Sequence, residues 1–275
     1  MRSDKFIDVK NLIKTKSPRL AKWIPGFIIR YLKRILHEDE INDFLELHKD
    51  EFNADFCRKV VDYFNIKIEV QGIENAPTEG PVIFTMNHPL GGMDAMVFIS
   101  AIREKRTDLK FIVNDLLMHL PNLRELFVGV NKHGKNDPSV REQINQLFSS
   151  ENAVCIFPAG LVSRRTKGEI MDLEWKKTFV TYARRNGQPI VPVYIEGELS
   201  PFFYRLAWIR KFLRIRINLE MLFLSDEMFK QRDKTIRFVI GKPIYIKDFE
   251  ERDDKILAQK IRAMVYEQKN RIELE

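Results

Sequence analysis

The N-terminal part of the chain has the spacing of amphipathic helices. Between Leu20 and Leu36, apolar residues recur three or four positions apart, and basic residues lie mostly between them. This spacing predicts a helix with one apolar face. Pro25 does not fit a helix interior, so we expect a short helix, a break, and a second helix that starts near Pro25. A further helical stretch begins at the acidic residues 38–40 and continues to Phe64.

From Lys67 onward the pattern changes to short apolar runs that alternate with helical segments. The runs that predict strands are residues 68–71, 82–86, 111–113, 126–130, 154–157, 190–195 and 236–240. The segments that predict helices are residues 93–103, 138–148, 173–185 and 253–271. Such alternation favours an α/β fold with a mostly parallel central sheet flanked by helices. We therefore expect an N-terminal helical segment over residues 1–66 and an α/β domain over residues 67–275.

The positive charge of the chain is concentrated at its N-terminus. Residues 1–36 contain ten basic side chains and two acidic ones, a net charge of +8, whereas the whole chain carries +7. A basic amphipathic helix with Trp and Phe on its apolar face is typical of segments that lie in the interface of an anionic membrane. The same face is also able to pack on the protein's own body. Nucleic-acid-binding proteins more often spread positive charge over a folded face, so we expect no nucleic acid partner.

The composition excludes several other classes of protein. With 44% hydrophobic and 31% charged residues, the chain is neither disordered nor collagen-like. Its two cysteines cannot form a disulfide framework, which favours a reducing compartment. No run approaches the roughly 20 apolar residues of a membrane span, and the N-terminus lacks the apolar core of a secretory signal. We therefore expect a protein that is made and kept in the cytoplasm.

The stretch from Val82 to Asp94 carries the first candidate chemistry. A predicted strand delivers Asn87 and His88 to its carboxyl end, a turn rich in Pro and Gly follows, and Asp94 opens the next helix. Histidine is well suited to take a proton from a hydroxyl near neutral pH, provided that a carboxylate fixes its ring. Two glycines would let the backbone turn so that both side chains meet. The alternative is a structural histidine beside an Asp that caps the helix.

A second candidate loop follows the strand predicted over residues 154–157. Phe157 ends this strand, Pro158, Ala159 and Gly160 form a turn, and a polar stretch with Ser163, Arg164 and Arg165 comes after it. Paired arginines beside a strand end are suited to bind a carboxylate or a phosphate through fork-shaped contacts. The alternative is a solvated loop.

The two stretches together resemble the glycerolipid acyltransferases related to lysophosphatidic acid acyltransferase. Members of that family carry Asn-His-x4-Asp after a strand, then Phe-Pro-Glu-Gly-Thr-Arg-Ser, then a strand like Val-Pro-Val. This chain has Asn87-His88 with Asp94, then residues 157–160, then residues 191–193, in the same order. The resemblance covers roughly residues 67 to 245, and the basic N-terminal helices resemble the membrane-docking helices of such enzymes.

The resemblance implies a mechanism and a set of site residues. His88 is expected to act as the general base on an acceptor hydroxyl, with Asp94 as its orienting partner and no acyl-enzyme. The acyl donor is expected to be an acyl carrier protein or coenzyme A thioester, with no further cofactor and no metal. A peripheral protein on the cytoplasmic face of the inner membrane is implied. The residues expected to bind substrate are Asn87, Phe157, Pro158, Gly160, Ser163, Arg164 and Arg165.

Three departures from the family pattern bear on the acceptor. Five residues separate His88 from Asp94 instead of four, Ala159 replaces the motif's Glu, and Arg164 follows Gly160 by four places instead of two. Members that acylate glycerol phosphate hold its phosphate with this motif. The chain is more similar to a bacterial branch that acts on amino-acid-containing lipids, such as lyso-ornithine or lyso-glycine lipid. Arg164 or Arg165 would then meet the acceptor's carboxylate or a donor phosphate. A lysophosphatidic acid acyltransferase and an inactive membrane-binding relative remain alternatives.

Two further segments have more than one interpretation. Residues 129–135 match the first seven positions of a P-loop, but Asn136 stands where Ser or Thr should bind the metal. The following helix also starts too late for its N-terminus to meet a phosphate, so we do not expect nucleotide hydrolysis. Lys132 in this segment is a candidate for the acceptor site through the family resemblance. Residues 202–212 combine aromatic and basic residues and form either a second membrane-facing element or a helix packed on the core.

Overall fold

The computed structural model describes residues 5–114, 120–130, 138–166 and 168–272. The chain divides into two compact units: Met1–Glu51 with Leu199–Arg232, called the helix unit here, and Phe52–Glu198 with Asp233–Glu275, called the sheet unit. This division differs from the boundary expected after residue 66. Residues 52–66 belong to the sheet unit, because the helix that they contain buries its apolar face in that unit. Residues 199–232 belong to the helix unit, together with the N-terminal helices.

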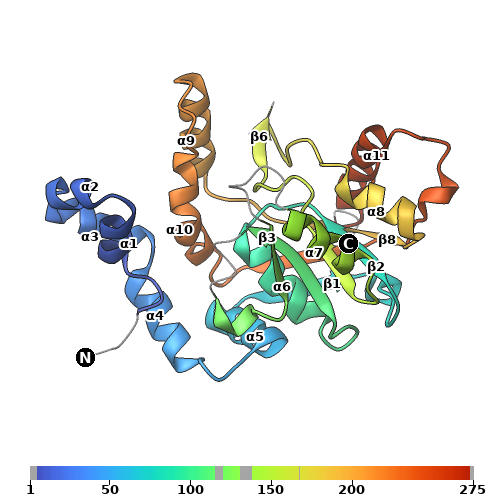
Figure 1. The fold of residues 1–275 in the computed structure, drawn as a ribbon, viewed down its shortest axis with the longest axis horizontal. Coiled ribbons are helices and arrows are strands. Elements are labelled where there is room, and N and C mark those ends of the chain that lie inside the picture. The colour runs from blue at the N-terminus through green and yellow to red at the C-terminus, as the bar shows by residue number, and fades with distance from the viewer. Residues whose placement is uncertain (1–4, 115–119, 131–137, 167, 273–275) are drawn as a thin grey trace. The chain divides into compact units, whose positions relative to one another are not determined.

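The sheet unit is built on a seven-stranded sheet with the order β1-β9-β8-β2-β5-β3-β4. Figure 1 labels β1, β2, β3 and β8 of this sheet. Neighbouring strands are parallel except β8 and β9, which are antiparallel. The expected α/β fold with a mostly parallel sheet is therefore confirmed. The strands of this sheet are β1 (Lys67–Gln71), β2 (Val82–Met86), β3 (Leu109–Asn114), β4 (Phe127–Val130), β5 (Ala153–Ile156), β8 (Ile190–Ile195) and β9 (Thr235–Ile240). A small hairpin of β6 (Arg164–Thr166) and β7 (Glu169–Met171), which the sequence pattern did not predict, lies outside it.

Helices cover both faces of the sheet. On one face, Phe98 of α6 (Gly92–Ile102) contacts Phe84, Phe111 and Phe238 from three strands, and α5 (Asn53–Tyr63) packs on α6. Successive residues of a strand point to opposite faces, and Ile83 accordingly joins the apolar cluster of the other face. That cluster includes residues of α7 (Pro138–Phe148), α8 (Thr178–Asn186) and α11 (Asp254–Glu267). Short elements among the described residues of this unit include α12 (Lys269–Ile272), η1 (Ile73–Asn75), η3 (Pro121–Leu123) and η5 (Ile246–Asp248).

Three predicted helical segments differ in extent from the observed ones. The stretch expected from residues 38–40 to Phe64 is interrupted between Leu47 and Asn53. The segment expected over residues 173–185 becomes helical only at Thr178, because Trp175 is held by another element: its N–H donates to Gln259 Oε1 and its carbonyl accepts from Gln259 Nε2. The segment expected over residues 253–271 is interrupted at Gln268, between α11 and α12.

The helix unit contains the N-terminal helices and a later helical segment. The predicted break falls at Ile24 and Pro25, between α2 and α3, with Pro25 as the N-cap of α3. The elements of this unit are α1 (Val9–Lys16), α2 (Pro18–Trp23), α3 (Gly26–Ile35), α4 (Glu38–Leu47), α9 (Pro201–Phe212), η4 (Leu219–Phe223) and α10 (Leu224–Phe229). In the described part of the chain, no helix has the length and apolar character to cross a bilayer.

Buried polar contacts hold the helix unit together. The carboxylate of Glu38, which is almost fully buried, accepts from Lys33 Nζ at 2.7 Å, Lys5 Nζ at 3.1 Å and the Val9 N–H at 3.0 Å. These contacts join α1, α3 and α4. His37 stacks on Phe229 with a centroid distance of 3.6 Å, which joins the N-terminal helices to α10.

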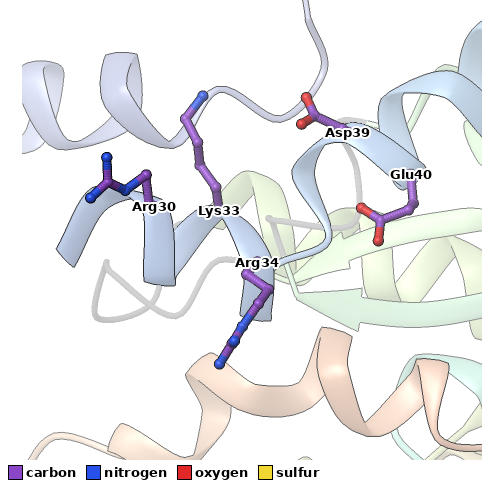
Figure 2. A pocket seen from close by; sticks show the side chains of 5 residues that line it. All are labelled: Arg30, Lys33, Arg34, Asp39 and Glu40. Carbon is purple, nitrogen blue, oxygen red and sulfur yellow. The ribbon is translucent and has the colours of Figure 1, made fainter. Parts of the chain in front are cut away.

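A hollow of about 330 Å³ lies between α3 and α4 and is lined by three basic and two acidic residues: Arg30, Lys33, Arg34, Asp39 and Glu40. Figure 2 shows that Arg30 and Lys33 extend to one side of α3 while Arg34 extends to the other. Lys33 is also paired with Glu38. The three cations therefore do not converge on one anion.

Candidate active site

The two motif loops meet because of the order of the strands. β2 and β5 are parallel neighbours, with Thr85 opposite Ile156, and the carboxyl ends of parallel strands lie at the same edge of a sheet. The loop with Asn87 and His88 leaves β2 at that edge, and Phe157 leaves β5 beside it.

His88 and Asp94 form a hydrogen-bonded pair. Nδ1 of His88 lies 2.8 Å from Oδ2 of Asp94. Asp94 is fully buried, whereas the His88 side chain is 17% exposed. Because an ionised carboxylate only accepts hydrogen bonds, Nδ1 carries the proton and Nε2 is left as the basic nitrogen. The pair has the geometry of a base and the carboxylate that orients it.

The turn before α6 accommodates the five-residue spacing between the two side chains. Gly91 has φ +69° and ψ −134°, a conformation that favours glycine. The backbone N–H of Leu90 donates to the Asp94 carboxylate, at 3.0 Å from Oδ2 and 3.2 Å from Oδ1. Asp94 is the third residue of α6, and the N-cap is Gly91. The alternative of Asp94 as the capping residue is therefore wrong.

Burial raises the pKa of the Asp94 carboxyl group to about 6. The hydrogen bond and positive charge that His88 supplies, together with the Leu90 N–H, oppose this rise, and the charge of Asp172 adds to it. Near neutral pH the carboxylate is ionised and is able to stabilise a positive imidazolium ring.

The Phe157 turn forms one wall of the site. The Phe157 ring stacks on the His88 ring, with a centroid distance of 4.2 Å and an interplanar angle of 22°. The Gly160 N–H donates to the Phe157 carbonyl, and Gly160 has φ +67°. Pro158 is buried, and its carbonyl accepts from the Lys176 N–H. Ala159 belongs to the buried apolar cluster, where an unpaired Glu would be costly.

Asn87 joins β2 to β8 beyond the last residue of β2. Its Nδ2 donates to the Ile195 carbonyl at 2.8 Å, and its Oδ1 accepts from the Ile195 N–H at 2.7 Å. The side chain thus continues the ladder of the sheet and fixes the peptide that leads to His88.

Asp172 is a site residue that the sequence analysis missed. It is buried, and its Oδ1 accepts from the His88 N–H at 3.1 Å and from Ser163 Oγ at 2.6 Å. Its Oδ2 accepts from Trp175 Nε1 at 2.8 Å. Ser163 is itself buried, and its N–H donates to the His88 carbonyl at 2.8 Å. The only signal in the sequence was an acidic residue between Met171 and Leu173, three positions before a tryptophan.

The structure gives the two expected arginines different surroundings. Arg164 Nη1 donates to the Val162 carbonyl at 2.9 Å and to the Ser163 carbonyl at 3.4 Å. Arg165 is more exposed and lies 3.8 Å from the Glu198 carboxylate. Lys132 lies outside the described residues. The substrate-binding roles assigned to these residues stay predictions.

A family model described as acyltransferase matches residues 11–273. The chain belongs to this acyltransferase family. Two bacterial relatives are similar along most of their length, and both are named lyso-glycine lipid O-acyltransferase. The protein from Bacteroides thetaiotaomicron is 45% identical over 240 residues, which cover 87% of this chain and 88% of that one. The protein from Phocaeicola vulgatus is 41% identical over 263 residues, covering 95% and 94%.

The fold of the acyltransferase is also similar to a solved structure. The crystal structure of the 1-acyl-sn-glycerophosphate (LPA) acyltransferase PlsC from Thermotoga maritima aligns with a TM-score of 0.51. The alignment covers 95% of this chain and 93% of that one, with 19% sequence identity. At this identity the similarity shows a shared fold, and the expected resemblance in fold is confirmed.

The other reactive groups of the acyltransferase are poor candidates for covalent chemistry. Cys57 and Cys155 are buried, and burial raises the pKa of both thiols, so neither is a ready thiolate nucleophile. Among the residues that the structure describes, no group of three or more His, Cys, Asp or Glu is arranged to hold a metal ion.

Proposed function

We propose that this acyltransferase moves a fatty acyl group from an acyl carrier protein or coenzyme A thioester to the hydroxyl of a lyso-glycine lipid. The observation that carries the reaction type is the pair of His88 and Asp94, with Nδ1 and Oδ2 2.8 Å apart. The choice of acceptor is supported by the two relatives, which are named for that activity. It is also supported by buried Ala159, at the position where the phosphate-binding motif has Glu.

The proposed reaction uses His88 as base and then as acid. Nε2 takes the proton of the acceptor hydroxyl as its oxygen attacks the thioester carbonyl, and a tetrahedral intermediate forms. When that intermediate collapses, the carbon–sulfur bond breaks, and the imidazolium returns the proton to the leaving thiolate. Asp94 holds the ring and stabilises the imidazolium, as the carboxylate of a catalytic triad does. Phe157 limits the tilt of the ring by stacking on it.

The experiment is a transfer assay with purified protein and three acceptors: lyso-glycine lipid, lyso-ornithine lipid and lysophosphatidic acid. Each acceptor is offered with acyl carrier protein and with coenzyme A thioesters. We expect transfer to lyso-glycine lipid, lost by at least about 10²-fold in His88→Ala. Preference for lysophosphatidic acid would favour the conventional alternative. Full activity of His88→Ala would overturn the general-base assignment.

We also propose that residues 1–36 bind an anionic membrane surface and place the protein on the cytoplasmic face of the inner membrane. The helices of this segment expose large side chains, including Trp23 at 86% and Phe27 at 64% exposure. Basic residues flank them, and the proposed acceptor is a lipid. Such a segment lies in the interface with its rings among the acyl chains and its cations on the headgroups.

A further inference from the structure

Residues 201–217, called the basic-aromatic segment here, comprise α9 and the chain that follows it. The segment contains no acidic residue, and its five basic residues are Arg205, Arg210, Lys211, Arg214 and Arg216. Every residue from Lys211 to Ile217 is exposed. A soluble helix normally keeps its large apolar side chains on the buried face, so this exposed run is unusual.

The largest side chains of the basic-aromatic segment point away from the protein core. Trp208 is 64% exposed, and Phe212 and Ile217 are each 72% exposed. The Trp208 and Phe212 rings, one helical turn apart, stack on each other with a centroid distance of 5.6 Å and an interplanar angle of 12°. Phe203 and Tyr204, near the start of the same helix, are buried instead. The helix therefore has an inner face that packs and outer side chains that do not.

The polar contacts of α9 fix it at both ends. At its start, the Ser200 N–H and Oγ both donate to the Glu227 carboxylate, each at 2.5 Å. At its end, Arg210 pairs with the fully buried Glu220 at 2.8 Å. The exposed rings thus belong to an anchored helix.

We propose that the basic-aromatic segment is a second membrane-binding element, which inserts Trp208, Phe212 and Ile217 into the interface of an anionic bilayer. Arg205, Lys211, Arg214 and Arg216 would then meet lipid phosphates, because their long side chains reach from the apolar boundary to the headgroups. An acidic protein surface would match these cations as well. The large exposed rings and aliphatic side chains favour lipid. Acyl chains would surround them with an apolar environment, whereas an acidic protein surface would place polar groups against them. This element is separate from residues 1–36, so the proposal does not depend on them or on the identity of the acceptor.

The tryptophans of the chain permit a direct test. Trp23→Phe in the full-length protein leaves Trp175, which is buried, and Trp208 as the two fluorophores. We expect vesicles of phosphatidylglycerol with brominated acyl chains to quench the Trp208 emission and spare that of Trp175. The double variant Trp23→Phe/Trp208→Phe should show no quenching. The proposal would be overturned if Trp23→Phe and the double variant were quenched equally, or if Trp23→Phe were not quenched at all.

Substitutions on the same surface give an independent measurement. Phe212→Ser should weaken partitioning onto these vesicles by about tenfold, the effect of withdrawing one large apolar side chain from lipid. Leu47→Ser, at an exposed apolar residue of α4, is the matched control and should bind like the parent. If Phe212→Ser instead lost binding to acyl carrier protein and kept its binding to vesicles, the surface would be a protein-docking site and the proposal would fail.

An acyl-transfer assay distinguishes a failure of this membrane-binding proposal from a failure of the proposed function. With a detergent-dispersed acceptor, Phe212→Ser should transfer acyl groups at the parental rate, whereas His88→Ala should not. Loss of dispersed-acceptor transfer in a folded Phe212→Ser protein would show a role other than membrane binding. A parent protein without transfer activity would refute the proposed function and leave the quenching result as it stands.

Discussion

His88 is held by two buried carboxylates that act on different parts of the residue. Asp94 binds the ring through Nδ1, and Asp172 binds the backbone N–H. Asp172 also binds Ser163 from the second motif and Trp175 from the segment before α8. It therefore sets the position of one motif loop against the other.

The first prediction at this scale concerns pH. Protonation of the buried Asp94 carboxylate removes the negative charge that orients the His88 ring and stabilises the imidazolium. Because burial raises the pKa of Asp94 to about 6, kcat/KM should fall as pH is lowered through about 6 and level off above it. Asp94→Asn, which cannot carry the charge, should lower kcat by about 10²–10⁴-fold. Initial rates between pH 5 and 8 check both; a profile flat across that range would contradict the assignment.

The second prediction concerns Asp172. Asp172→Asn replaces one acceptor oxygen with an NH2 group, which would face a donor N–H or O–H. The variant should lose about 1–3 kcal/mol of unfolding free energy, measured by urea denaturation. Its kcat should fall while KM for the acyl donor changes little, because the base is misplaced. The exposed neighbour Glu174→Gln is the control; an unchanged kcat in folded Asp172→Asn would rule out the positioning role.

At the scale of elements, the sequence predicted the strands of the main sheet because apolar runs bounded by turns are a local signal. It also predicted that Asn87, His88 and the turn at Pro158 and Gly160 follow strand ends, although it placed Phe157 in the strand, which ends at Ile156. The β6–β7 hairpin was missed because three-residue strands such as Arg164–Thr166 have no apolar alternation. Asp172 and the return of α9 and α10 to the N-terminal helices were missed for another reason. Both depend on contacts between residues far apart in the sequence. Examples are the hydrogen bond from the His88 N–H to Asp172 and the stacking of His37 on Phe229.

The prediction for the N-terminal helices follows from their exposed side chains. Trp23→Ser and Phe27→Ser together should weaken binding to phosphatidylglycerol vesicles by about 10²-fold or more, because each ring loses about 1.5–3 kcal/mol of burial in lipid. Vesicle co-sedimentation measures the change. The circular dichroism spectrum should stay that of the parent, since neither ring is buried in the fold. Parental binding by this variant would show that residues 1–36 are not the anchor.

For the whole molecule, the positive charge is concentrated in one of the two units. The helix unit contains 18 basic and 12 acidic residues, a net charge of +6, out of +7 for the whole chain. Charge gathered in this way speeds the encounter with an oppositely charged surface and is screened by salt.

The last prediction tests that asymmetry. The rate of association with anionic vesicles should fall steeply as ionic strength rises from about 0.01 M to 1 M, because the Debye length shrinks from about 30 Å to 3 Å. The dissociation rate should change less, since it depends on the inserted rings. Stopped-flow light scattering measures both rates. An association rate independent of salt would mean that charge does not guide docking.

The place of His88 at the end of β2 also bears on how the enzyme loses its activity. β2 is fully buried and lies between β8 and β5, inside the sheet. Amide protons of such a strand exchange with deuterium only through the largest opening events of a protein. The imidazole is therefore tethered to the slowest-exchanging part of the molecule, and heat inactivation should coincide with cooperative melting instead of preceding it.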